Sequence, residues 1–267
     1  MVDERALLLV SLGAYFIAAL VGLFALRKPR AAPAATIILG LALSAHALSI
    51  GLRWARLGHG PYVNLYEILS SNVWSLHAAV FAAAIASGLA RRLIGLALAV
   101  LQILTLWLFI TPPVDSPLPI TYSSPWLPVH ITLGKIFLGL TLLAVGLSIA
   151  VITRRVKPAS FSNLPPSPIL EETAFRLMLV AAIFESLMLI AGAAWAQDAW
   201  GHYWAWDPLE IWAFATWASV IAYLHWRSAL KPNPERASLA VIGIFVMAFL
   251  TFFGVPFLST APHKGAI

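Results

Sequence analysis

The sequence predicts an all-α polytopic membrane protein with about eight transmembrane helices, and three observations support this fold class. Of the 267 residues, 61% are hydrophobic and only 10% are charged. The mean hydropathy is +0.87, which is far above the range of soluble globular domains. The apolar runs are close to the roughly 20 residues that a helix needs to cross a hydrocarbon core. The alternating strands of a membrane β-barrel would give a different pattern.

Clusters of Arg and Lys or Pro-rich loops interrupt the apolar runs. The first run follows Asp3 and Glu4 and has no small-residue cleavage site after it, so we expect it to remain in the mature chain. The Pro-rich segment 154–172 is predicted to be a cytoplasmic linker between two four-span halves. The expected spans are 6–26, 34–52, 64–88, 93–111, 130–153, 173–196, 209–228 and 237–255.

The positions of the basic residues predict the orientation in the membrane. Basic clusters follow the first, third, fifth and seventh spans, which places all four on one face, and the positive-inside rule makes that face cytoplasmic. The loops 112–129 and 197–208 on the other face contain no Arg or Lys. Both termini and the loop 197–208 are therefore expected on the outer face. This topology accounts for the net charge of +6, so no nucleic-acid partner is expected.

The outer loop before the seventh span is unusually aromatic. Residues 200–212 read WGHYWAWDPLEIW, and residues 195–217 hold six of the eleven tryptophans. Tryptophans also form belts at membrane interfaces, and Trp54, Trp107 and Trp226 fit that simpler role. A belt spreads its tryptophans over many span ends, whereas these six are concentrated. The concentration favours a binding surface for a flat apolar ligand.

Histidines at the same face indicate which ligand this is. The chain has no cysteine, so metal or redox chemistry would have to use histidine, carboxylate or methionine. His130 at the outer end of the fifth span, His202 in the aromatic loop and His263 in the tail all fall on the outer face. Two imidazoles on opposite sides of a flat macrocycle form an axial pair, and indole rings suit the faces of a porphyrin. The pattern predicts haem.

The start of the seventh span has helix-capping residues. Asp207 fits an N-cap and Pro208 the first turn, so the aromatic loop would lie over the positive end of this helix. Because Asp207 and Glu210 would repel haem propionates, we assign them to capping and to hydrogen bonding with tryptophan or histidine donors.

These residues resemble the tryptophan-rich WWD signature of the haem-handling cytochrome c assembly proteins, most closely the CcsA (ResC) branch. The resemblance rests on Trp200-Gly201-His202-Tyr203-Trp204-Ala205-Trp206-Asp207-Pro208 with Glu210 and Trp212, and on Tyr223-Leu224-His225-Trp226-Arg227. Three further segments fit the same branch: Asn64-Leu65-Tyr66-Glu67, Trp126-Leu127 with His130, and Gly254-Val255-Pro256-Phe257-Leu258 leading to His263. The related CcmC proteins also carry WWD, but Asp207-Pro208-Leu209-Glu210 departs from their pattern.

The resemblance implies a set of haem-binding residues within a single integral membrane haem-handling domain, residues 1–267. His130 and His263 match the external axial ligands of the haem iron, and His225 matches an intramembrane histidine ligand. Lys264-Gly265 replaces the family's usual sequence after the last histidine. The other expected haem-binding residues are Trp195, Trp200, Tyr203, Trp204, Trp206, Asp207 and Trp212.

The resemblance also implies an activity shared with a partner. Haem b would be held at the outer face for thioether attachment to the Cys-x-x-Cys-His motif of an apocytochrome c, together with a CcsB (ResB)-like membrane protein. The chain would then contribute to a holocytochrome c synthase activity in the plasma (inner) membrane, or in the thylakoid membrane of a plastid. The alternatives are a CcmC-like haem transfer protein, or a HemX-like assembly protein or transporter without a haem site.

Other polar residues within the spans allow two interpretations. His46 and His77 could be internal haem ligands or core histidines that donate to a neighbouring carbonyl, and His202 could point into the haem site or away from it. His225 could also be an interfacial histidine beside Arg227. Lys135 and Glu185 would face a polar cavity or extend toward the interface.

Overall fold

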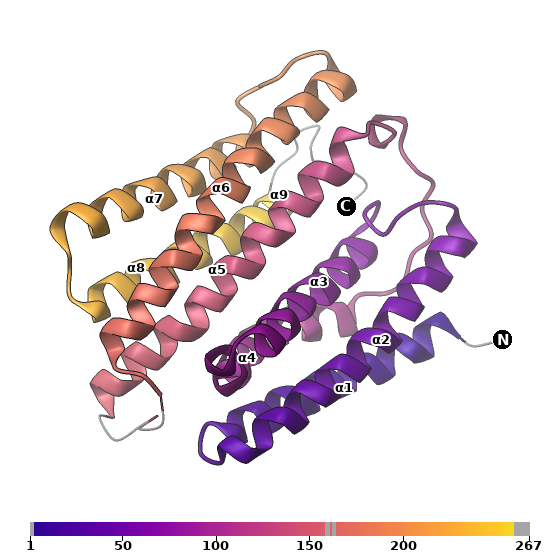
Figure 1. The fold of residues 1–267 in the computed structure, drawn as a ribbon. Coiled ribbons are helices and arrows are strands. Elements are labelled where there is room, and N and C mark those ends of the chain that lie inside the picture. Colours follow the sequence, from indigo (N-terminus) through magenta and orange to yellow (C-terminus); the bar gives the residue numbers. More distant parts are fainter. Residues whose placement is uncertain (1–2, 158–160, 162–163, 259–267) are drawn as a thin grey trace. The chain divides into compact units, whose positions relative to one another are not determined.

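The computed structural model describes residues 3–157, 161 and 164–258, and within these ranges the fold is helical and contains no strand (Figure 1). The predicted all-α class is confirmed. The long helices are α1 (Glu4–Ala25), α2 (Ala32–Leu57), α3 (Leu65–Ala86), α4 (Gly88–Ile110), α5 (Trp126–Val156), α6 (Ser167–Trp200), α7 (Pro208–Leu230) and α8 (Pro234–Phe253). The short helices are η1 (Pro29–Ala31), η2 (Ile120–Tyr122) and α9 (Val255–Leu258).

The chain forms two compact units. The first ends at Pro117 and contains α1 to α4, and the second starts at Leu118 and contains α5 to α9. The prediction that 154–172 links two four-span halves is therefore wrong, because that segment joins α5 to α6 inside the second unit. The prolines of 154–172 made this segment look like a boundary, but a connection between two packed helices can carry the same prolines. A single haem-handling domain over 1–267 stays a prediction.

In the first unit, α1 packs against both α2 and α4. The contact with α4 is made backbone to backbone at two glycines. A Cβ atom added to Gly95 would lie 2.2 Å from the carbonyl carbon of Gly22, and one added to Gly22 would lie 2.8 Å from Cα of Gly95. Small residues of this kind let helices in a bilayer approach closely and gain van der Waals contact.

In the second unit, α5 packs against α6 and α8, while α7 packs against α6 and α8. Polar side chains join α7 to both neighbours. The hydroxyls of Thr216 and Thr251 lie 2.9 Å apart, and the indole of Trp217 donates to Ser186 Oγ at 2.8 Å. Within the membrane these bonds satisfy polar groups that lipid could not.

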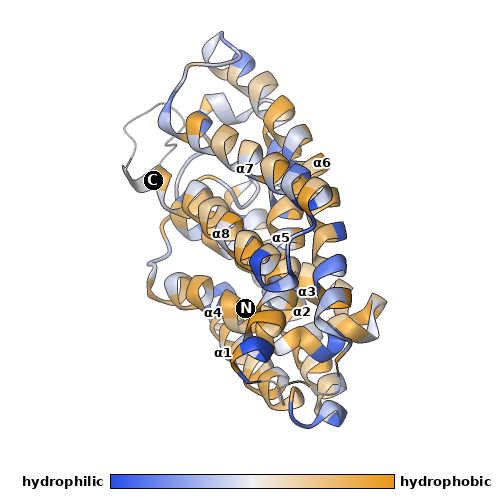
Figure 2. Cartoon of the chain, turned by 90° about the vertical axis from the view of Figure 1, so that its left-hand side faces the viewer, coloured by the Kyte–Doolittle hydropathy of each residue, from blue (hydrophilic) through white to orange (hydrophobic). Residues whose placement is uncertain are grey.

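Among the residues that the structure describes, seven of the eight long helices are long and apolar enough to cross a membrane, and α7 is not one of the seven. Hydrophobic residues dominate the helices in Figure 2. The α7 sequence contains three tryptophans, Tyr223, His225 and Arg227, which lower its hydropathy. The eight predicted spans thus correspond to eight helices, seven of which are candidate membrane spans. Most helices extend beyond the predicted spans by a few residues at one or both ends, because hydropathy marks the lipid-facing part and not the caps. The orientation stays a prediction.

Candidate functional site

His130 lies in the second turn of α5, where α6 determines its orientation. Its Nδ1 lies 2.9 Å from the carbonyl oxygen of Met188. Because a carbonyl only accepts, Nδ1 must carry the ring proton, which leaves the lone pair on Nε2. This is the tautomer of a histidine that binds a metal through Nε2, with its other nitrogen fixed by a hydrogen bond.

A glycine on α6 makes room for this imidazole. A Cβ atom added to Gly192 would lie 2.8 Å from Nδ1 of His130 and 2.9 Å from Cε1. The indole of Trp195, one turn further along α6, stacks with the His130 ring at a centroid distance of 6.0 Å and an interplanar angle of 30°. Gly192 and Trp195 together define the plane of the imidazole.

Trp195 is the centre of an aromatic cluster. Its side chain is buried, and its Nε1 donates to the carbonyl of Thr121 at 2.9 Å. Tyr122 and Trp200 contact it edge to face, at 5.9 Å and 5.0 Å between ring centroids. Burial raises the pKa of Tyr122, so its phenol stays neutral at physiological pH. The cluster joins η2, α5 and α6 beside His130.

The loop 201–207 presents aromatic side chains outward. Gly201 ends α6 with φ of 78°, and Trp206 also adopts a left-handed φ of 60°. Such a backbone is uncommon for a bulky residue and is retained where the surroundings enforce it. Trp206 is 70% exposed and Tyr203 is 64% exposed, although neither is charged. Large exposed rings of this kind form a surface for a ligand or a partner.

The capping box of α7 fixes the end of this loop. Asp207 accepts from the amide of Glu210 at 3.0 Å, so its predicted role as N-cap is confirmed. The carboxylate of Glu210 accepts from the amides of Ala205 and Asp207, at 2.8 Å and 3.4 Å. Glu210 therefore binds the backbone of the loop.

Trp204 packs edge to face against Trp206 and Phe214, and its buried Nε1 has no partner among the described residues.

Comparison with known proteins identifies the family to which this arrangement belongs. Residues 62–263 match the family model described as cytochrome C assembly protein. The chain belongs to that family. Among its curated relatives are the cytochrome c biogenesis proteins CcsA of Porphyra purpurea, 30% identical over 86% of this chain and 85% of that one, and of Guillardia theta, 31% identical over 80% and 79%. The CcsA-type resemblance seen in the sequence is thereby confirmed.

A solved structure shares the fold. The cytochrome c heme lyase CcmF superposes with a TM-score of 0.72 at 19% identity, covering 95% of this chain. The chain spans 47% of the length of that protein. At this identity the likeness concerns the fold alone. The assembly-protein family and the helical fold agree that the chain is a cytochrome c biogenesis protein of multi-pass type.

Two other histidines expected in this assembly protein, His225 and His202, lie on α7 and in the loop 201–207. His225 is exposed on α7, 17 residues after Pro208, which corresponds to about 25 Å along a helix. It is thus close to the end of α7 opposite the aromatic loop. Trp212 lies on the first turns of α7 and is 38% exposed, and His202 is exposed in the loop. His263 lies outside the described residues.

His46 and His77 belong to the core of the first unit. The Nδ1 atom of His77 donates to the carbonyl of Val73 at 2.8 Å, as expected for a core histidine, whereas His46 bonds to the side chains of Tyr15 and Ser70. In the second unit Glu185 is buried, and its Oε2 has no partner among the described residues. Lys135 is half-buried on α5.

Sequence reasoning missed the residues that hold His130. Gly192 and the backbone carbonyl of Met188 carry no chemical signature, and their importance depends on the register of α5 against α6. A glycine inside an apolar span, a few residues before the aromatic segment, is the one signal the sequence offers.

Proposed function

We propose that this assembly protein holds haem at the outer membrane face and presents it for attachment to an apocytochrome c. The observation that carries the proposal is the geometry of His130, with Nδ1 donating to the Met188 carbonyl and the ring stacked on Trp195. The hydrogen bond at Nδ1 leaves Nε2 as the ring atom that would bind the iron. The names of the CcsA relatives support the same role.

The exposed rings of the loop 201–207 would cover the haem. Trp206 and Tyr203 offer apolar faces to the porphyrin, while the buried Trp204 Nε1 offers a donor to an acceptor on the ligand. Glu210 holds the loop backbone through two amides, which keeps its carboxylate occupied and away from the propionates. The loop residues would thereby orient the haem and exclude water. His263 is the proposed second axial ligand.

In this proposal the chain positions the haem, and the reacting groups belong to the haem and the apocytochrome. The thiols of the apocytochrome add to the haem vinyl groups, and the chain keeps the iron coordinated until the histidine of the apocytochrome replaces His130 or His263. The haem is haem b before attachment. A CcsB (ResB)-like membrane protein is the proposed partner. The exposed position of His225 on α7 supports a second haem bound between that partner and this chain, because a polar side chain at membrane depth normally meets protein.

The test is the absorption spectrum of the detergent-purified protein, expressed with haem available. We expect a sharp α band of reduced bis-histidine haem that His130→Ala removes or greatly changes. Thr132→Ala is the matched control, because Thr132 is exposed on the same helix two residues after His130 and its hydroxyl donates to the carbonyl of Pro128. Holocytochrome c levels in cells should fall in step with the spectrum.

Two results would contradict the proposal. An unchanged spectrum and normal holocytochrome c in His130→Ala would remove His130 from the ligand set. A colourless wild-type protein that takes up no added haem, even with its partner present, would favour an assembly or regulatory protein without a haem site.

A further inference from the structure

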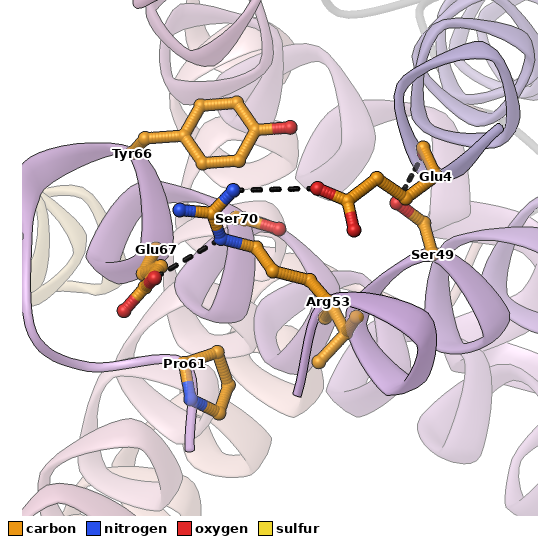
Figure 3. A pocket seen from close by; sticks show the side chains of 8 residues that line it. Glu4, Ser49, Arg53, Pro61, Tyr66, Glu67 and Ser70 are labelled. Carbon is orange, nitrogen blue, oxygen red and sulfur yellow. Dashed lines mark hydrogen bonds and ion pairs between the residues drawn. The ribbon is translucent and has the colours of Figure 1, made fainter. Parts of the chain in front are cut away.

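A small charged cavity opens at one end of the first unit. Its volume is about 10 Å³, close to the minimum that holds one water molecule. Figure 3 shows the side chains around it, which come from the start of α1, the end of α2 and the start of α3. Its lining includes the charged or hydroxyl-bearing residues Glu4, Ser49, Arg53, Tyr66, Glu67 and Ser70. Their polar groups can form hydrogen bonds with a water molecule.

Ion pairs fix the walls of this cavity. Arg53 donates from Nε to Glu67 at 3.0 Å and from a terminal nitrogen to Glu4 at 3.4 Å, and its guanidinium lies 5.0 Å from the centre of the Tyr66 ring. Arg53 and Glu67 are both buried. The charges therefore cannot move apart freely, and the space between them keeps its polar character.

A chain of hydrogen bonds leads from the cavity into the core. Ser70, which lines the cavity, has its Oγ 2.9 Å from Nε2 of His46. Nδ1 of the same imidazole lies 3.1 Å from the hydroxyl of Tyr15. His46 and Tyr15 are fully buried. Hydroxyls and imidazoles each accept and donate, so a proton can pass along such a chain.

The deep end of the chain meets a second imidazole. The ring of His77 stacks on Tyr15 with 3.9 Å between centroids and an angle of 20°. Its Nδ1 donates to the Val73 carbonyl, so Nε2 has the lone pair, and this buried Nε2 has no partner among the described residues. The charged residues of α4, the remaining helix of the unit, are Arg91 and Arg92 in its first turns. Tyr15, His46 and His77 thus lie together in the core of the unit, and the carboxylates of Glu4 and Glu67 line the cavity.

We propose that the first unit contains a proton-transfer path from the cavity to His46. A hydronium ion in the cavity gives a proton to Ser70 Oγ while Ser70 passes its own proton to Nε2 of His46. The products are water and an imidazolium that donates to Ser70 and Tyr15 from both nitrogens. The imidazolium is short-lived because a charge buried in a low dielectric is costly. Histidines inside membrane spans commonly serve such relays. The path does not depend on the haem site.

The direct test is hydrogen exchange at the His46 ring. The full chain, with ¹⁵N-labelled histidine, is placed in lipid bilayers, and solid-state NMR measures proton exchange at Nε2 of His46, the atom that receives the proton in the proposed step. We expect His46 to exchange faster than the buried backbone amides around it. Ser70→Ala should slow this exchange by roughly tenfold or more, because exchange then requires local opening of the helices. Ser70→Thr, which keeps the hydroxyl, should restore it.

Two further variants distinguish an effect on the proton path from an effect on the stability of the fold. Ser75→Ala removes another hydroxyl on α3 that donates to the backbone carbonyl of Asn72, so it should leave the exchange unchanged. Ser49→Val fills the cavity but leaves Ser70 and His46 intact, and it should slow exchange even if Ser70→Ala fails to fold. Exchange at His46 as slow as at the core amides in the wild type would overturn the proposal. So would equal rates in the wild type, Ser70→Ala and Ser49→Val.

Discussion

At the scale of single residues, a glycine determines what His130 can do. The sequence predicts His130 as a candidate ligand, because it shows both the residue type and the position beside an aromatic loop. It was not sufficient to select Gly192, since the missing Cβ matters only once α5 and α6 are placed in register. Likewise, the acceptor for Nδ1 is a backbone carbonyl, which every residue possesses.

Replacement of Gly192 by alanine should therefore damage the proposed haem site specifically. The added Cβ would lie 2.8 Å from Nδ1, so the imidazole must shift by several tenths of an ångström or more. Holocytochrome c formation should fall about 10- to 100-fold, as expected when a functional group is misplaced. Gly243→Ala is the matched control, because no atom lies within 4 Å of a Cβ added there. If holocytochrome c formation fell equally in both variants, or fell in neither, Gly192 would not position His130.

Asp115 gives a prediction about pH at the same scale. Hydrogen bonds from Arg56 hold the pKa of this carboxyl below its usual range. The ionised form is thus favoured in the folded state, and its stabilising effect is present above the unfolded value of about 3.9 and is lost as the pH falls through the lower folded pKa. Amide exchange in the loop 111–117 should increase on acidification below about pH 4. Asp115→Asn should remove this dependence of amide exchange on pH. If amide exchange in the wild-type loop did not change on acidification, the ion pair would not stabilise the loop.

At the scale of elements, the start of α7 was predictable and the conformation of the loop before it was not. Asp207, Pro208 and Glu210 form a local pattern with a known geometry, and the structure contains the expected cap. The left-handed backbone of Trp206 follows from no propensity, because tryptophan disfavours it. The low hydropathy of α7 comes from its tryptophans, Tyr223, His225 and Arg227. The sequence analysis nevertheless predicted 209–228 to be a membrane span like the other seven.

The cap should contribute measurably to this element. Asp207→Ala removes the acceptor for the Glu210 amide and should lower the free energy of unfolding by about 1 kcal/mol. Amide exchange at the first turn of α7 should become faster. Asp207→Asn keeps an N-cap oxygen and should behave nearly as the wild type. If alanine and asparagine have the same effect, the role of Asp207 lies elsewhere than in capping.

At the scale of the whole molecule, the division into two units, one with α1 to α4 and the other with α5 to α9, follows from helix packing, which hydropathy does not report. The eight apolar runs correspond to eight long helices among the described residues, and seven of these are candidate membrane spans. The boundary was misplaced, because contacts between distant helices decide which of them form a unit. The predicted orientation of the helices in the membrane rests on the positions of Arg and Lys. Because the insertion machinery of the cell reads these charges, the orientation has to be tested in cells.

The absence of cysteine makes that test direct. Single-cysteine variants can be made at two exposed serines, Ser123 before α5 and Ser228 near the end of α7. A membrane-impermeant maleimide should label Ser123→Cys in intact cells or spheroplasts. Ser228→Cys should react only after the membrane is permeabilised. The reverse pattern would place the aromatic loop and His130 on the cytoplasmic face and remove the basis for presentation to an exported apocytochrome.

The glycine contact between α1 and α4 has a consequence for how the protein is made. Gly22 and Gly95 are 73 residues apart (95 − 22 = 73), so the ribosome synthesises α2 and α3 before the partner surface of α1 exists. At about 5–20 residues per second this interval lasts roughly 4–15 s. During this interval, the surface of α1 around Gly22 faces lipid because α4 is not yet present. The first unit can close only when its last helix has been inserted, which makes α4 the step that completes its assembly.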